Sequence, residues 1–289
     1  MKALVTGAGG QVATALAKLK PAGAELISLS QDELDITDRD AVRRRMAILD
    51  PDVIINAAAY TAVDKAETEN ELAERVNGAA PGYLAEAAHA NGARLLHIST
   101  DFVFDGKADS PYRPDAATAP LGAYGLSKLH GEQRALEASH GEALVLRTAW
   151  VYAAAGHNFV RTMLRIMGER GTVRVVDDQR GSPTWADSVA RALWAAAARP
   201  QFRGIHHWTD AGEASWYDFA LAIAAEGREL GLLRTPVEVF PIATADYPTP
   251  AKRPAYSVLD RSSTEAGLGL KATPWRDNLK KMLMELKHA

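Results

Sequence analysis

Short apolar stretches alternate with longer amphipathic ones along the first half of the chain. The apolar stretches predict strands at 3–7, 25–30, 53–59, 94–100 and 143–152. The segments between them have helical periodicity, over 11–20, 38–49, 67–91 and 124–139, and Asp38 stands where the second helix needs an N-cap. The strands are apolar throughout instead of alternating, which is typical of a parallel sheet covered by helices on both faces. The pattern therefore predicts an α/β fold with a doubly wound parallel sheet.

The second half of the chain has a different pattern. After about residue 153 strands become fewer and prolines are scattered, while helices are expected near 158–169, 184–198, 215–229 and 275–287. No low-complexity linker separates the halves. We therefore expect one domain over 1–152 and a smaller C-terminal lobe over 153–289, some segments of which return to the first domain.

Composition narrows the class of protein. The 289 residues suffice for about two domains, at roughly 150 residues each. The net charge of −3 argues against a nucleic-acid binder, and the absence of cysteine excludes disulfides and thiolate chemistry. No run approaches the roughly 20 apolar residues of a membrane span, and the N-terminus lacks a signal-peptide layout. We expect a cytoplasmic protein with no membrane contact.

A glycine-rich loop, TGAGGQVA at 6–13, follows the first predicted strand and opens the first helix. Gly7, Gly10 and Ala13 have G-x-x-G-x-x-A spacing, which allows a tight turn and a close approach of backbone N–H groups to a pyrophosphate. The helix N-terminus adds a partial positive charge. A plain structural turn is the alternative, but the strand–loop–helix context favours dinucleotide binding on a Rossmann fold.

The end of the second strand bears on the choice of cofactor. Ser30 stands where NAD-specific folds place an acid for the ribose 2′-hydroxyl, and no arginine stands there for a 2′-phosphate. Asp32 and Glu33 lie just beyond and could fold back as the missing acid. Asp35 and Ile36 could bracket adenine, although Asp35 could instead cap a turn. We expect NADPH to be modestly preferred, with NADH also functional.

Tyr124 and Lys128 have Y-x-x-x-K spacing, which places both side chains on one face of a helix. An ammonium about 4 Å from a phenolate stabilises it by about 4 kcal/mol at an effective dielectric near 20, or about 3 pKa units. The pKa of Tyr124 is then expected near neutrality, where a general acid works best. Thr100 ends the fourth strand, where ligands of such sheets bind. The three residues together indicate a nicotinamide-dependent enzyme acting on an alcohol or ketone.

With these motifs the chain resembles the extended short-chain dehydrogenases/reductases, and within them the dTDP-4-dehydrorhamnose reductase family. The matching strings cover nearly the whole chain: TGAGGQV (6–12), PDVIINAAAYTAVDKAE (51–67), HISTDFVFDG (97–106), APLGAYGLSK (119–128), LRTAWVY (146–152), NFVRTML (158–164), DDQRGSPT (177–184) and TPAKRP (249–254).

The resemblance implies roles for individual residues. Tyr124 would be the proton donor, Lys128 its pKa setter and nicotinamide-ribose ligand, and Thr100 the partner of the sugar oxygen. Cofactor contacts are implied for Gly10, Gln11, Val12, Ser30, Asp35, Ile36, Ala59, Tyr60 and Thr61, in addition to Gly7 of the glycine loop. Substrate positions are implied for Asp101 and Trp150.

Three further residues are candidates for the substrate site. The substrate implied by the resemblance is a dTDP-4-keto-6-deoxy sugar, whose diphosphate requires a cation. Arg253, between Pro250 and Pro254, could supply a guanidinium for the phosphate oxygens, or it could face solvent. Asn158 and Gln179 could read the edge of thymine.

Some family members form dimers through a metal held by carboxylates, one of them on the opening helix. Ala15 stands at the matching position here, although Asp187 and Glu285 could supply the other carboxylates. We therefore expect no metal, and a monomer or a weak homodimer.

The motifs predict an NAD(P)H-dependent oxidoreductase, and the resemblance implies that it reduces the 4-keto group of dTDP-4-dehydro-6-deoxy-L-mannose. One alternative is another extended reductase or epimerase on a nucleotide sugar. A second is a non-catalytic NADP-binding regulatory subunit, although a pure binder has no need for Thr100, Tyr124 and Lys128 together.

Overall fold

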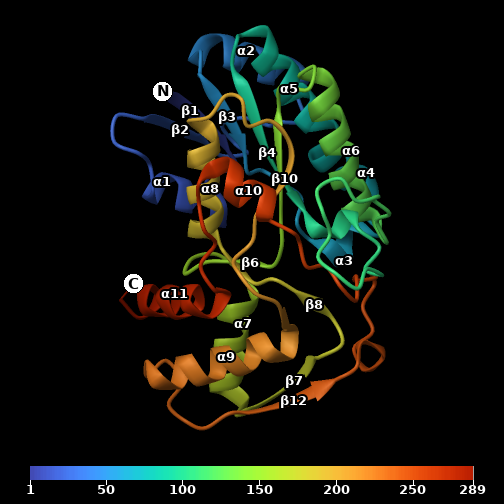
Figure 1. The fold of residues 1–289 in the computed structure, drawn as a ribbon, viewed down its shortest axis with the longest axis vertical. Helices are drawn as coiled ribbons and strands as arrows, with labels where there is room; N and C mark the ends of the chain where they lie inside the picture. The colour runs from blue at the N-terminus through green and yellow to red at the C-terminus, as the bar shows by residue number, and fades with distance from the viewer. Residues whose placement is uncertain (289) are drawn as a thin grey trace.

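The computed structural model describes residues 1–288, and its centre is a six-stranded parallel sheet (Figure 1). The strands lie in the order β10-β5-β4-β3-β1-β2. Their bounds are β1 (Lys2–Thr6), β2 (Glu25–Leu29), β3 (Val53–Asn56), β4 (Arg94–Thr100), β5 (Leu144–Thr148) and β10 (Gly204–His207). The chain begins at β1 and builds outward in both directions, so a crevice opens at the carboxyl ends of β1 and β3. The predicted doubly wound fold is confirmed.

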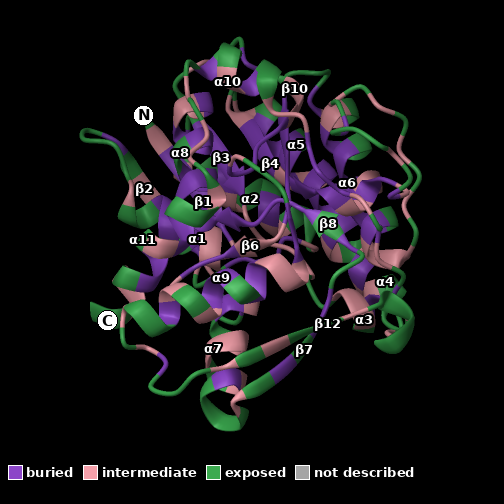
Figure 2. Cartoon of the chain, turned by 60° about the horizontal axis from the view of Figure 1, so that its bottom comes forward, coloured by how far each residue is buried: buried purple, intermediate pink, exposed green. Residues whose placement is uncertain are grey.

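Helices cover both faces of the sheet because successive side chains of a strand point to opposite faces. Ala3 and Val5 of β1 pack in one core cluster with residues of α1 (Gln11–Lys18) and α8 (Ala186–Ala197). Leu4, between them, packs in the cluster on the other face. That cluster contains residues of α2 (Arg39–Leu49), α5 (Ala80–Ala90) and α6 (Ala123–Ala138). Figure 2 shows buried residues concentrated in the sheet and the helices against it.

Local signals account for several element boundaries. The Asp38 side chain accepts a 2.9 Å hydrogen bond from the backbone N–H of Ala41 and caps α2, as predicted. The strand expected over 143–152 is broken, because Trp150 adopts a positive φ of 48° after β5. The chain then forms β6 (Val151–Tyr152), which pairs with β9 (Thr184–Trp185) outside the central sheet.

The helix expected over 67–91 is a succession of shorter elements. These are α4 (Asn70–Ala73), the π-helical turn η1 (Glu74–Ala79) and α5, and the short helix α3 (Val63–Ala66) precedes them. The elements α3, α4 and η1 connect the end of β3 to α5, which packs against the sheet (Figure 1).

The second lobe has its own core, built around Tyr152, Phe219 and Met282. Its helices are α7 (Phe159–Arg170), α9 (Trp216–Glu229) and α11 (Trp275–His288), and β7 (Thr172–Val176) pairs in parallel with β12 (Glu238–Ile242). The shorter elements are η2 (Asp101–Val103), β8 (Arg180–Gly181), β11 (Ala214–Ser215), η3 (Thr244–Asp246) and α10 (Ser262–Leu268). Because α8 packs on the sheet and β10 completes it, the chain beyond residue 152 contributes to both lobes. Within residues 1–288 no helix combines the length and the apolarity needed to cross a membrane.

Candidate active site

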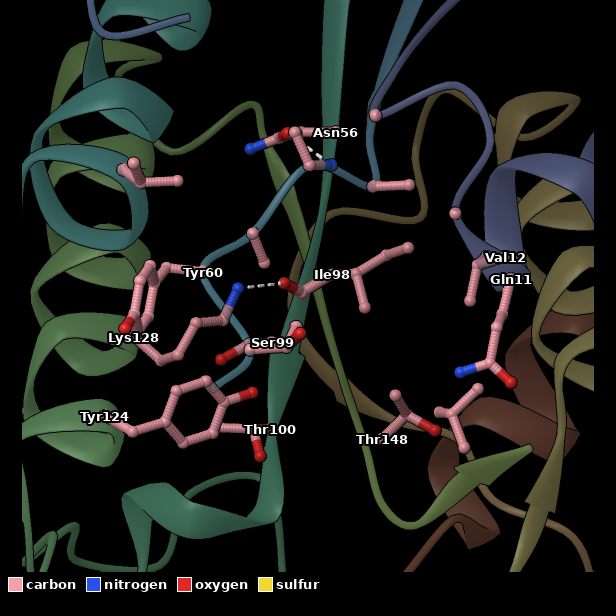
Figure 3. A pocket seen from close by; sticks show the side chains of 18 of the residues that line it. Gln11, Val12, Asn56, Tyr60, Ile98, Ser99, Thr100, Tyr124, Lys128 and Thr148 are labelled. Atoms are coloured by element: carbon pink, nitrogen blue, oxygen red, sulfur yellow. Dashed lines mark hydrogen bonds between the residues drawn. The ribbon is translucent and has the colours of Figure 1, made fainter. Parts of the chain in front are cut away.

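A cavity of about 980 Å³ lies along the carboxyl edge of the central sheet, and Figure 3 shows part of its lining. Loops after β1, β2, β3, β4 and β5 meet there, together with α6. The cavity brings together most residues singled out in the sequence: Gly7, Gly10, Gln11, Val12, Asp35, Ile36, Ala59, Tyr60, Thr61, Thr100, Asp101, Tyr124, Lys128, Trp150 and Arg253.

The glycine loop fits a dinucleotide pyrophosphate. Gly7 has a φ of 80°, and a Cβ there would lie 2.7 Å from the backbone nitrogen of Ala58, so no larger residue fits the turn. Gly10 N-caps α1 without a side-chain hydrogen bond, and the first turn of α1 has no acidic residue. First-turn N–H groups of a helix have no partner within the helix, so those of α1 remain available to an anion at the cavity.

Ser30 is the exception among the expected cofactor residues, because it is not part of the cavity lining. Its backbone N–H and its hydroxyl donate to Oε2 of Glu33, at 2.8 and 2.9 Å. These two hydrogen bonds lower the pKa of Glu33. Glu33 has therefore folded back onto the end of β2, as the sequence allowed, and the adjacent Gln31 lines the cavity instead.

Asp35 combines the two roles that the sequence left open. Its Oδ1 accepts hydrogen bonds from the backbone N–H and the hydroxyl of Thr37, so it caps a turn. It also lines the cavity, next to Ile36.

The structure places Thr100, Tyr124 and Lys128 together at the floor of the cavity (Figure 3). Thr100 ends β4, and the other two side chains lie one turn apart on α6. Gly125 allows this approach, because a Cβ at that position would lie only 2.2 Å from the carbonyl oxygen of Phe102. The ring of Phe102 also meets the Tyr124 ring edge-on, with centroids 5.6 Å apart.

The pKa of Tyr124 differs from the near-neutral value that the sequence predicts. Burial raises the pKa of Tyr124 to about 12; the nearby Thr100 acts to lower it and the charge of Asp101 to raise it. The expected shift of this pKa toward neutrality is therefore not found. Burial is the largest cause of the upward shift, and Lys128 is not among the groups that act on this pKa. Nζ of Lys128 donates a 2.6 Å hydrogen bond to the carbonyl oxygen of Ile98 (Figure 3).

Burial also alters the two charged neighbours of Tyr124. It lowers the pKa of Lys128 to about 8, while the nearby Glu132 acts to raise it. Burial raises the pKa of Asp101 to about 6, against the lowering effects of the nearby Ser257 side chain and of a hydrogen bond from Thr100.

A buried ion pair lies behind the end of β4, the strand that carries Thr100. Arg147 of β5 donates to both carboxylate oxygens of Glu132 of α6, at 2.8 and 2.7 Å, and both side chains are almost fully buried. The same carboxylate accepts a 2.5 Å hydrogen bond from the hydroxyl of Ser99, next to Thr100. The pair thus ties β4, β5 and α6 together beneath the site.

Aromatic and charged groups of the second half of the chain form the outer part of the cavity. The ring of Trp150 stacks on that of Trp216, 3.5 Å apart at 7°, and both line the cavity. Arg253 also lines it, paired with Asp64 of α3. Trp216 and His157 were missed in the sequence, since no local motif connects them with the glycine loop.

Asn158 and Gln179 do not line the cavity. The Asn158 side chain N-caps α7 by accepting from the N–H of Arg161 and donates a 2.9 Å hydrogen bond to Oε1 of Gln11. Gln179 donates to the hydroxyl of Thr244. Both amides bind other parts of the protein here, so contacts with thymine remain a prediction.

The carboxylates considered for a metal bind a lysine instead. Nζ of Lys18 lies 2.9 Å from Oδ2 of Asp187 and 2.6 Å from Oε2 of Glu285. Ala15, on the same helix, is buried. Over residues 1–288, no group of three histidine or carboxylate side chains is arranged to hold a metal ion.

Comparisons with known proteins agree with this geometry. A family model described as the RmlD substrate binding domain matches residues 1–288. A dTDP-4-dehydrorhamnose reductase of Burkholderia thailandensis is 44% identical over 286 residues, which are 96% of each chain. The crystal structure of a dTDP-4-dehydrorhamnose reductase from Clostridium acetobutylicum is 39% identical, with a TM-score of 0.93 over 99% of this chain and all of that one. One from Bacillus anthracis, in complex with NADP, is 33% identical, with a TM-score of 0.92 over 98% of this chain and 99% of that one.

Proposed function

The chain belongs to the RmlD substrate binding domain family, and from this premise we propose that it is a dTDP-4-dehydrorhamnose reductase. It reduces the 4-keto group of dTDP-4-dehydro-6-deoxy-L-mannose to give dTDP-L-rhamnose, with NADPH as cofactor and NADH as a functional substitute. The observation that carries the proposal is the meeting of Thr100, Tyr124 and Lys128 in the same cavity as the N-terminus of α1.

A nicotinamide dinucleotide, when bound, supplies the hydride for the carbonyl carbon. Tyr124 keeps its proton at the phenol oxygen, since burial raises its pKa to about 12, and donates it to the oxygen that becomes an alkoxide. The Thr100 hydroxyl donates to the same oxygen, which orients the ketone. The Lys128 ammonium, on the next turn of α6, stabilises the phenolate that Tyr124 leaves.

The outer cavity suits the rest of a nucleotide sugar. The Trp150 and Trp216 rings offer an apolar wall for the sugar, and Asp101 can accept from its hydroxyl groups, since its Oδ2 has no hydrogen-bond partner. Arg253 binds the diphosphate. Gly7, Gly10, Gln11 and Val12 hold the cofactor pyrophosphate, and Asp35 and Ile36 bracket its adenine.

We propose that the enzyme works in the cytoplasm without nucleic acid, as a monomer or a weak homodimer. The ammonium of Lys18 already forms ion pairs with Asp187 and Glu285, which supports an assembly that needs no bridging metal. Sedimentation with and without a chelator tests this, and a chelator-sensitive dimer would contradict it.

The decisive experiment is an assay of nicotinamide oxidation with a panel of 4-keto nucleotide sugars that differ in base and in sugar epimer. We expect turnover with the dTDP-4-keto-6-deoxy-L-sugar and much weaker turnover with the others. Oxidation only with a different sugar would indicate another reductase of the same fold. Cofactor binding with no turnover on any of them would indicate a regulatory subunit.

A further inference from the structure

His97 of β4 lies directly behind the catalytic lysine. Its side chain is buried, with Nδ1 3.0 Å from Nδ2 of Asn56 of β3 and Nε2 3.5 Å from Nζ of Lys128. His97 does not line the cavity, so it contacts neither cofactor nor substrate. Whatever it contributes to the reaction must act through Lys128.

The orientation of the Asn56 amide determines which nitrogen of His97 carries the hydrogen. Oδ1 of Asn56 lies 3.2 Å from the backbone nitrogen of Ala58 and 2.7 Å from the hydroxyl of Thr6. The N–H of Ala58 can only donate, so the carbonyl oxygen of the amide must face it. The NH₂ group of Asn56 therefore faces His97.

An NH₂ group can only donate, so Nδ1 of His97 must accept. A neutral imidazole with Nδ1 as acceptor carries its hydrogen on Nε2, the nitrogen that faces Lys128. Burial first, and then the charge of Lys128, hold the pKa of His97 well below its usual value, so the ring stays neutral.

An N–H directed at Nζ opposes the ammonium form of the lysine and can donate to its neutral form. Nζ is held in place by the carbonyl oxygen of Ile98, at 2.6 Å. Of the other charged or titratable groups around Lys128, Glu132 is one turn on along α6, forms an ion pair with Arg147 of β5, and acts to raise the pKa of Lys128. Tyr124 is one turn back, and Asp101 of η2 lies beside Tyr124.

We propose that His97 is a positioning residue for Lys128: its Nε2–H, fixed by Asn56, opposes the ammonium form and so limits the pH range in which charged Lys128 is present. The kinetic consequence rests on the proposed reductase function, whereas the tautomer of His97 does not. The two can therefore be tested separately.

The first test reads the tautomer in the unaltered, cofactor-free protein. Two-bond ¹H–¹⁵N correlations of ¹⁵N-histidine-labelled protein distinguish Nε2–H, Nδ1–H and doubly protonated rings, and the signal missing in His97→Gln identifies His97. We expect a neutral Nε2–H ring throughout pH 6 to 8. A Nδ1–H or a protonated ring overturns the proposal.

The second test is the pH profile of kcat/KM for ketone reduction, which falls at alkaline pH as Lys128 loses its proton. In His97→Gln an amide oxygen can replace Nε2–H and accept from the ammonium, which favours the charged form. We expect the alkaline limb to move up by about one pH unit. His206→Gln, outside the cavity, should leave the limb in place.

An alkaline limb that does not move in folded His97→Gln overturns the proposal. If His97→Gln does not fold, the tautomer of the unaltered protein, assigned through the other seven histidines, decides alone. Absence of reductase activity in the unaltered protein would contradict the proposed function and leave the tautomer result standing.

Discussion

The guanidinium of Arg253 forms a two-pronged ion pair with the carboxylate of Asp64, with Nη1–Oδ1 at 3.1 Å and Nη2–Oδ2 at 2.9 Å. The pair fastens the segment around Pro250 to α3 at the edge of the cavity, and Asp64 also accepts from the backbone N–H of Ala251. Hydrogen bonds from Arg253, and then from Ala251, lower the pKa of Asp64. A substrate diphosphate must therefore bind the guanidinium alongside the Asp64 carboxylate or displace that carboxylate.

Replacement of Arg253 is expected to weaken binding of the nucleotide. A charge-assisted hydrogen bond contributes about 1.5–3 kcal/mol, so Arg253→Ala should raise KM for the sugar nucleotide by about 10- to 150-fold. Calorimetric titration with dTDP measures the effect without turnover. Equal affinities of the unaltered protein and Arg253→Ala for dTDP would show that Arg253 binds Asp64 and not the diphosphate.

The matched variant Asp64→Asn removes the competing charge and keeps the side-chain shape. We expect it to bind dTDP as tightly as the unaltered protein or more tightly, because Arg253 is freed. A loss as large as that of Arg253→Ala would mean that the ion pair, and not the diphosphate contact, positions the segment.

Tyr124→Phe removes only the phenol hydroxyl, and the ring contact with Phe102 should preserve the packing. Without a proton donor at the developing alkoxide, kcat should fall by about 100-fold or more, with little change in cofactor affinity. Steady-state kinetics on folded variants measure this. Tyr112→Phe is the control, since its hydroxyl binds Asp105 outside the cavity, and near-normal turnover of Tyr124→Phe would refute the assignment.

Glu33 is expected to weaken the preference for NADPH. Its carboxylate accepts two hydrogen bonds from Ser30, so its negative charge lies at the end of β2, where the sequence predicts contact with the ribose 2′-position. We expect both cofactors to work, with NADPH modestly preferred by less than about 30-fold in kcat/KM. Glu33→Gln should raise the NADPH-to-NADH ratio.

Ser30→Asp is the companion variant. Because Glu33 already places an acid at the end of β2, this substitution should change the ratio little. Strict dependence on NADH in the unaltered enzyme, or an unchanged ratio in Glu33→Gln, would contradict the role given to Glu33.

Glu132→Gln leaves the guanidinium of Arg147 buried without a charged partner. Breaking such a pair costs about 3–5 kcal/mol in the free energy of unfolding. Denaturant titration measures the loss, with Glu142→Gln, from a solvent-exposed pair with Arg203, as a control expected to cost about 1 kcal/mol or less. The double variant Glu132→Leu, Arg147→Met leaves no buried charge, so it should recover much of the lost stability. A loss below about 1 kcal/mol in Glu132→Gln alone would contradict the prediction.

Asp101 makes stability depend on pH in an unusual direction. Its pKa is about 6 in the folded protein against 3.8 for the free side chain, so the folded state binds the proton more tightly. The stability that this proton provides is present below about pH 4 and is lost as pH rises through about 6, for a total of about 3 kcal/mol. Asp101→Asn stays neutral, so its stability relative to the unaltered protein should rise between pH 4 and pH 7.

The control for this titration is Asp105→Asn. Hydrogen bonds from Lys107 and Tyr112 lower the pKa of Asp105, so the relative stability of its variant changes at and below about pH 4 and should stay nearly constant between about pH 5 and pH 7. Parallel pH curves for unaltered and Asp101→Asn protein would show that Asp101 is not held protonated.

The sequence by itself determined five of the six strands of the sheet, the glycine loop and the three residues proposed as catalytic. Apolar strand runs and helical periodicity are local signals, and Thr100, Tyr124 and Lys128 follow from a strand end and an i, i+4 spacing. Only the tertiary structure decided which partners the charged side chains of the site and its surroundings bind. Lys128 binds the carbonyl of Ile98, Arg253 binds Asp64, and Lys18 binds Asp187 and Glu285, each joining segments distant in sequence.

Local sequence signals likewise do not predict two features of the sheet. These are the break of the fifth strand at Trp150 and the pairing of β10 with β5. A positive φ at a tryptophan is strained and persists only where its neighbours hold it, here through the stack on Trp216. The prediction of a near-neutral pKa for Tyr124 is wrong because it uses only the helical spacing of Tyr124 and Lys128. Spacing on a helix fixes which residues share a face, whereas burial and the partners from other strands fix their protonation.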